Sequence, residues 1–198
     1  MSKQSFSIFA VALTFIAFYP YIYSTLQGRI QPHVFSWIIW GIATLVVFGA
    51  QLSDNAGVGA WAIGLSGGIA LVIALLAYMN QGDMRVTNSG WLFLIGALSA
   101  LPFWYLTSDP LWAVLILTTV DLLGFAPTLK KVHRDPSSES LLFFALLTLR
   151  NLFVILALEH YSVTTVLFPA VVSIACVMLI LTAHYRRRVL KQMPNHSL

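Results

Sequence analysis

The sequence predicts an all-α fold: an integral membrane seven-helix bundle built from two parallel three-helix repeats plus a linker helix. Three observations lead to this prediction. Hydrophobic residues make up 59% of the 198 positions and charged residues only 9%, which is too apolar for one water-soluble core. Apolar stretches of about 20 residues, the length that crosses a bilayer, fill nearly the whole chain. The third observation is a repeated order of prolines and serines.

Turn and loop residues divide the apolar sequence into seven expected spans. The first span is expected to be retained and not cleaved as a signal peptide, because it continues through Tyr19 and Pro20 without a small-residue cleavage site. Several links are very short, which predicts antiparallel neighbours in a compact bundle. The expected spans are residues 5–26, 35–52, 56–79, 90–106, 110–132, 140–158 and 162–185.

The distribution of Lys and Arg predicts the orientation of the chain. With seven spans, nine basic residues fall on one side of the membrane and only Lys3 on the other, so the N-terminus is expected outside and the tail at 186–198 in the cytoplasm. An even number of spans would remove this asymmetry. The net charge of +4 then reflects orientation, and no nucleic-acid partner is expected. The nine residues are Arg29, Arg85, Lys130, Lys131, Arg134, Arg186, Arg187, Arg188 and Lys191.

Two segments of the chain share an order of residues. Each has a Pro within a span, a second Pro in the basic loop that follows, and a Ser at the start of the next span, before a third apolar span. The layout is therefore a first triple-helix unit at 5–79, a linker helix at 90–106 and a second unit at 110–185. Because one span separates them, both units have the same orientation. The matched pairs are Pro20 and Pro127, Pro32 and Pro136, and Ser36 and Ser140.

This layout resembles the SWEET and PQ-loop superfamily, whose members pair two three-helix units around a central pathway. The resemblance covers essentially the whole chain and implies a carrier of small solutes. Two family features differ here. Tyr21 and Thr128 follow the prolines where the PQ-loop signature has Gln, and neither third span contains the Asn that is typical of sugar carriers.

Two ionisable residues, Asp121 and Arg150, lie well inside apolar spans, where a charge is costly enough to indicate a functional site. Both are expected about 14 Å from the cytoplasmic ends of their helices, near the bilayer centre. An ion pair between them is predicted, or one polar cavity that both line, with Asn151 beside them. Two interpretations stay open. The pair is a structural staple between helices, or Arg150 holds an anionic group while Asp121 accepts a proton.

Other candidates surround this site. Pro20 and Pro127 each remove a helical hydrogen bond at matching positions, so they are candidate hinges, with ordinary packing as the alternative. Trp37, Trp40 and Gln51 are candidate linings of a central cavity. For the two tryptophans, anchoring at the membrane interface is the alternative.

The sequence predicts no enzyme. The five His are scattered without metal-ligand spacing, no nucleophile motif occurs, and no cofactor is expected. The expected function is a small-solute membrane transporter that works by alternating access around the polar midplane site, with proton coupling through Asp121. Its partners are the lipid bilayer and a small polar solute, and self-association into a homo-oligomer stays open. The alternative is a receptor or scaffold that binds a partner without moving it.

Overall fold

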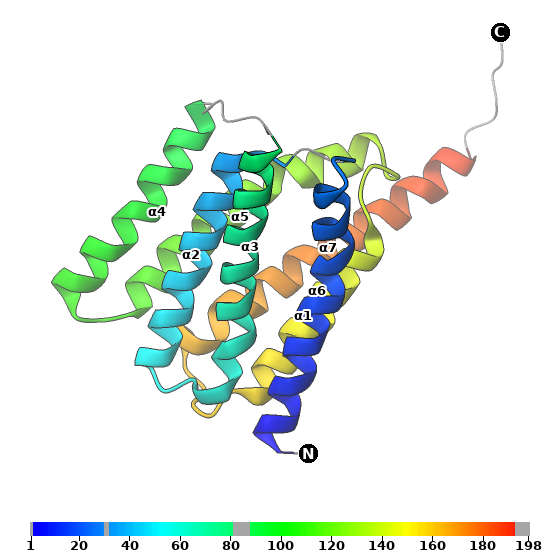
Figure 1. Cartoon of the computed structure of the whole chain (residues 1–198). Coiled ribbons are helices and arrows are strands. Elements are labelled where there is room, and N and C mark those ends of the chain that lie inside the picture. Colours follow the sequence, from blue (N-terminus) through cyan, green and yellow to red (C-terminus); the bar gives the residue numbers. More distant parts are fainter. Residues whose placement is uncertain (1, 30–31, 81–87, 193–198) are drawn as a thin grey trace, which may run out of the picture.

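The computed structural model describes residues 2–29, 32–80 and 88–192, apart from the side chains of residues 88, 89, 127, 191 and 192. Seven α-helices and one short 3-10 helix make up this part of the chain (Figure 1). They are α1 (Lys3–Leu26), α2 (Val34–Ser53), η1 (Gly57–Ala60), α3 (Trp61–Met79), α4 (Asn88–Thr107), α5 (Leu111–Arg134), α6 (Leu141–Ala157) and α7 (Val163–Gln192).

Side chains at the helix starts fix where several helices begin. The Ser2 hydroxyl accepts a hydrogen bond from the Ser5 backbone N–H, and the Ser140 hydroxyl caps α6 in the same way. Each such cap satisfies one of the backbone donors that a helix start leaves free. Ser36, expected at the start of the second span, lies in the first turn of α2, whose cap is His33.

Six of the seven α-helices are long and apolar enough to cross a membrane. The exception is α6, an apolar helix of 17 residues, which is about 26 Å long. Many large apolar side chains on the outside of the bundle are exposed, among them Ile8, Leu92 and Leu106. In water this surface would be unfavourable, and the chain is therefore a multi-pass membrane protein.

Consecutive helices are not always neighbours in this bundle. Helix α3 packs against both α1 and α2, and α7 packs against both α5 and α6. We call α1, α2 and α3 with η1 the first triplet, and α5, α6 and α7 the second triplet. The triplets meet mainly where α1 contacts α6 and, less extensively, where α2 contacts α5. Helix α4 lies at the periphery against α5 and α2 (Figure 1).

Glycines allow two close backbone approaches. A Cβ at Gly41 of α2 would lie 3.2 Å from the Gly67 carbonyl oxygen of α3. A Cβ at Gly59 of η1 would lie 2.7 Å from the backbone nitrogen of Leu158, which ends α6. The second approach holds the two triplets in contact at the end of the bundle where α1 begins. We call this the N-terminal end and the opposite one, where α7 finishes, the C-terminal end.

The last helix differs from the predicted boundary. It continues to Gln192, so the first part of the expected tail at 186–198 is helical. Arg and Lys are good helix formers, and hydrogen bonds from Arg186 and Arg187 to backbone carbonyls hold this extension against the end of α5 and the following loop. In Figure 1 the extension projects away from the rest of the bundle.

Candidate functional site

The middle of the second triplet contains polar atoms that are buried without partners. Arg150 of α6 is only 4% exposed, and its Nε and Nη1 atoms have no hydrogen-bond acceptor. The next residue, Asn151, is fully buried, and neither its amide nitrogen nor its oxygen has a partner. Buried polar groups are nearly always hydrogen-bonded in proteins. The sequence predicted both residues as site candidates, and neither is used to hold the fold by hydrogen bonds.

Two hydroxyl groups on the neighbouring helices are also buried without a hydrogen-bond partner. Thr118 of α5 and Ser173 of α7 are buried, and their side-chain oxygens lack partners. Thr118 precedes Asp121 by three positions and Ser173 precedes Cys176 by three, so each pair lies on one face of its helix. We call Thr118, Arg150, Asn151 and Ser173 the midplane polar residues, since each lies near the middle of α5, α6 or α7, with α7 packed against the other two.

The predicted ion pair between Asp121 and Arg150 is wrong. Among the described residues, no carboxylate lies within ion-pair distance of Arg150, and Asp121 has no hydrogen-bond partner. The prediction assumed that α5 and α6, being consecutive and antiparallel, pack side by side. Instead α7 packs against both of them. The two charged residues therefore lie on helices that have no extensive contact with each other, and the structural staple that a direct pair would provide is absent. The alternative, one polar cavity that both residues line, stays a prediction.

Cys176 of α7 has a free, buried thiol. Arg150 and Asp121 are both near enough to contribute to the electrostatic environment of this thiol. It is the single cysteine of the chain. The thiol is therefore a single site for chemical modification within the second triplet.

In the described part of the first triplet, the one buried side-chain atom without a hydrogen-bond partner is Gln51 Oε1, near the end of α2. Thr14 of α1 is fully buried, and its hydroxyl donates to the Ala10 carbonyl at 2.8 Å. Ser66 of α3 donates in the same way to Ala62 at 2.9 Å. These bonds satisfy both hydroxyls within their own helices. The charge and the unmet hydrogen bonds at mid-depth are therefore confined to one half of the bundle.

The remaining candidates occupy other places. Trp37 and Trp40 of α2 lie towards the C-terminal end, where their rings are 5.4 Å apart and nearly perpendicular. Gln51 is fully buried near the end of α2, and its amide donates to the Thr165 carbonyl at 2.9 Å. It thus connects helix ends and does not lie at mid-depth. Pro20 lies exposed within α1, and Pro127 lies within α5, its side chain outside the described part.

A network of hydrogen bonds closes the N-terminal end of the bundle. The Asp54 carboxylate accepts from the Ser162 hydroxyl, while His160 Nδ1 donates to the Asp54 carbonyl at 3.0 Å. The Glu159 carboxylate accepts from the Val58 N–H at 3.2 Å. Gly57, with φ +62°, leaves room for that carboxylate. We call Asp54, Glu159, His160 and Ser162 the loop latch.

Further hydrogen bonds at this end strengthen the connection. Lys3 at the start of α1 donates to the Leu156 carbonyl at 3.0 Å and to the Tyr161 hydroxyl at 2.9 Å. With the loop latch and Gln51, these are the side-chain hydrogen bonds that join the two triplets between described residues, and all lie at the N-terminal end. At the C-terminal half the triplets meet through aromatic rings, such as Phe18 against Phe143 at 5.7 Å.

The midplane polar residues carry side chains that can bind a solute. Within the described residues, no group of three His, Cys, Asp or Glu side chains lies together to hold a metal ion. A guanidinium, a carboxamide and two hydroxyls can hold a polar or anionic group by charge-assisted and neutral hydrogen bonds. Comparison with family models, with curated proteins and with solved structures finds no match to this chain.

Sequence reasoning missed Thr118, Ser173 and the loop latch. Hydroxyl residues within apolar helices commonly bond their own backbone, as Thr14 does. Nothing in the local sequence distinguishes Thr118 and Ser173, whose hydroxyls make no such bond. The latch joins residues 108 positions apart, Asp54 and Ser162, and only the three-dimensional arrangement shows their contact.

Proposed function

We propose that the chain is a small-solute transporter that works by alternating access, with the midplane polar residues as its binding site. The observation that carries the proposal is the buried Arg150 guanidinium with unpartnered nitrogens. Burying such a charge without an acceptor costs several kcal/mol. A bundle that served packing alone would gain by replacing it, so we infer that a bound solute supplies the missing acceptors.

The helix contacts support the two-repeat architecture that this mechanism uses. If α1, α2 and α3 correspond to α5, α6 and α7, the third helix of each triplet packs between the other two. The same correspondence relates the contact of α1 with α6 to that of α5 with α2. Two copies related by an axis along the membrane normal would have these paired contacts, with α4 as the linker. The resemblance to the SWEET and PQ-loop layout agrees with this proposal.

The arrangement of charges favours a solute with an anionic group. Arg150 would bind the anion, and Asn151 would contribute a donor and an acceptor at the same depth. Asp121 of α5 would accept a proton during the cycle and so couple transport to a pH gradient. The hinge role of Pro20 and Pro127 belongs to the same proposal, since rocking of one triplet against the other needs deformable helices.

The loop latch supports a conformation that is closed at the N-terminal end. By the positive-inside rule this end would be the outer one, so solute would leave towards the cytoplasm from this state. Release of the latch would let the triplets separate at the outer end. Alternating access would then consist of exchanging the hydrogen-bonded contacts at one end for closer contacts at the other.

The native Cys176 gives a direct test of access to the site. Protein in liposomes is treated with a charged, membrane-impermeant methanethiosulfonate, and modification is measured by mass spectrometry. Transport predicts slow but complete modification without denaturant, because the space beside Arg150 must open to water in each cycle. Ser162→Ala, which removes the latch hydroxyl, should change the rate of modification, whereas Cys176→Ser should abolish it.

A receptor or scaffold that binds without transport is the second candidate, favoured by the closed network at the N-terminal end. The receptor hypothesis predicts that Cys176 in folded protein stays unmodified when the methanethiosulfonate is added on either side of the membrane. Full modification after unfolding in detergent would show that the thiol itself is reactive. That combination of results would exclude the transport proposal and favour the receptor.

A further inference from the structure

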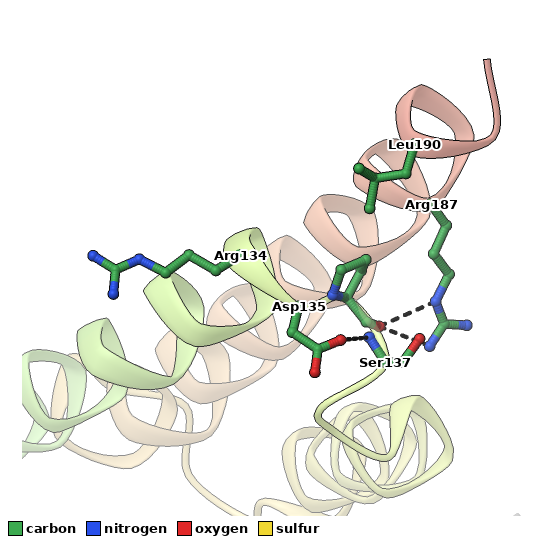
Figure 2. Close-up of a pocket in the computed structure, with 6 residues that line it drawn as sticks. Arg134, Asp135, Ser137, Arg187 and Leu190 are labelled. Carbon is green, nitrogen blue, oxygen red and sulfur yellow. Dashed lines mark hydrogen bonds between the residues drawn. The ribbon is translucent and has the colours of Figure 1, made fainter. Parts of the chain in front are cut away.

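A second polar feature lies at the C-terminal end, away from the midplane polar residues. The end of α5, the loop before α6 and the extension of α7 enclose an open pocket of about 570 Å³ (Figure 2). We call it the arginine pocket. Its lining consists of Arg134, Asp135, Pro136, Ser137, Arg187 and Leu190.

Two arginines of α7 connect this helix to the segment after α5, and one of them, Arg187, lines the pocket. Arg187 donates from Nε and Nη2 to the Pro136 carbonyl at 3.1 and 2.8 Å, and Arg186 donates from Nε to the His133 carbonyl at 2.8 Å. These bonds fix the extension of α7 to the segment that follows α5. Both guanidinium groups keep their full charge, because a neutral carbonyl oxygen accepts the bonds. Each also keeps N–H donors that these bonds do not use.

Positive charge accumulates around the pocket with little to neutralise it. Lys131 pairs with Glu139 at 2.8 Å. Asp135, which accepts from the Ser137 N–H at 2.9 Å, contributes one negative charge to the lining. Among the described side chains of α5 and α7 that lie towards the C-terminal end, five further cations have no carboxylate within ion-pair distance. Arg134 and Arg187 both line the pocket, and in Figure 2 the Arg134 side chain extends away from Arg187. The five are Lys130, Arg134, Arg186, Arg187 and Arg188.

Apolar and aromatic side chains lie beside these cations. Leu190, in the pocket wall, is 44% exposed, and Tyr185 is 66% exposed on the same extension. Helix α7 has 30 residues, about 45 Å in length, whereas the hydrocarbon core is about 30 Å thick. The extension therefore reaches beyond the core. Exposed Leu and Tyr next to Arg are typical of a segment at headgroup level.

We propose that the arginine pocket binds the phosphate of an anionic phospholipid headgroup. Orientation by positive charge accounts for the excess of basic residues at this end but does not require that they enclose a pocket. Basic pockets between membrane helices bind such headgroups by charge-assisted hydrogen bonds to phosphate. Leu190 and Tyr185 would contact the upper part of the lipid chains. This inference does not depend on transport, so either proposal can fail while the other stands.

The test compares thermal unfolding of the full chain in nanodiscs of phosphatidylcholine alone and with phosphatidylglycerol. Phosphatidylglycerol should raise the Tm of the wild type by about 3 to 6 °C. Arg187→Gln should remove most of this rise. Because Arg187 also holds the loop, Arg134→Gln serves as a second variant, since Arg134 lines the pocket without a hydrogen bond in the structure. Lys130→Gln is the matched control, since it removes one equal charge outside the pocket.

The outcomes separate a site from diffuse attraction. Retention of the lipid effect in Lys130→Gln, with its loss in Arg187→Gln and its reduction in Arg134→Gln, would support the pocket. An equal loss in all three variants would overturn it in favour of general surface charge, and a wild type without lipid dependence would overturn it outright. A third arm adds inorganic phosphate to phosphatidylcholine nanodiscs. The same Tm rise there would assign the pocket to free phosphate and refute the lipid.

Discussion

Replacing Arg150 by Met tests whether the buried guanidinium serves binding or structure. Met keeps a flexible, unbranched apolar side chain in the packed space between helices; it is two atoms shorter than Arg and has no N–H groups. Each buried donor left without an acceptor costs about 1 to 3 kcal/mol, and Arg150 has two such nitrogens. Exchange of buried ionic groups for apolar ones commonly stabilises by about 1 to 4 kcal/mol. Arg150→Met should therefore stabilise the empty protein.

The expected change in Tm depends on the length of the chain. For a protein of about 150 to 250 residues, 1 kcal/mol shifts Tm by about 2 to 4 °C. Arg150→Met should thus raise the Tm by roughly 2 to 15 °C, measured by tryptophan fluorescence in one detergent. Arg188→Met is the control, since that side chain is exposed and an exposed substitution should change stability by no more than about 0.5 kcal/mol.

The opposite result would refute the reasoning. A buried charge that is compensated in the native state destabilises by about 3 to 5 kcal/mol when one partner is removed. A fall in the Tm of Arg150→Met by several degrees would therefore show that Arg150 holds the fold, and the binding role would lose its support. Solute uptake by the stabilised variant would contradict the proposal as well.

Three further perturbations give distinct results. Gly59→Ala should destabilise the protein by about 1 to 3 kcal/mol, because the new Cβ would meet the backbone of Leu158 at 2.7 Å. Gly68→Ala, with nothing within 4 Å of its Cβ, should stabilise it by about 0.5 to 1 kcal/mol. Equal effects of the two substitutions would contradict the observed packing. Asp121→Asn should make uptake of a panel of radiolabelled small carboxylates into proteoliposomes independent of an imposed pH gradient, and an unchanged dependence would exclude Asp121 as the proton acceptor. Asp54→Ala should alter Cys176 modification as Ser162→Ala does, since both remove one hydrogen bond of the loop latch; a change in only one variant would argue against a shared gate.

The helices could be predicted from sequence. Hydropathy and turn residues place each helix start within two residues of its observed position, apart from the third, which begins with the 3-10 turn η1. The end of α7 could not be predicted in this way, because polar helix formers continue it past the apolar segment. Hydropathy measures transfer into lipid, and it does not report where the helical hydrogen bonding stops.

The candidate site was predicted in part. Arg150, Asn151 and Asp121 stand out because charge and amide groups are rare within apolar spans. The absence of an ion pair between Asp121 and Arg150 could not be derived from sequence, because the order of helices around a bundle depends on packing between distant segments, and α7 packs against both α5 and α6. The same holds for the loop latch, whose members become neighbours only when both triplets are folded.

The two ends of the bundle differ in the cost of separating the triplets, and this difference determines which end opens more easily from the observed state. At the N-terminal end, hydrogen bonds from Lys3, Gln51 and the loop latch must break together, and the close approach of Gly59 to Leu158 limits gradual sliding. At the other end, Phe18 meets Phe143 edge to face at 5.7 Å. Aromatic contacts of this kind contribute only about 0.5 to 1.5 kcal/mol beyond their burial and tolerate a range of geometries. Water should therefore reach Arg150 first from the C-terminal side.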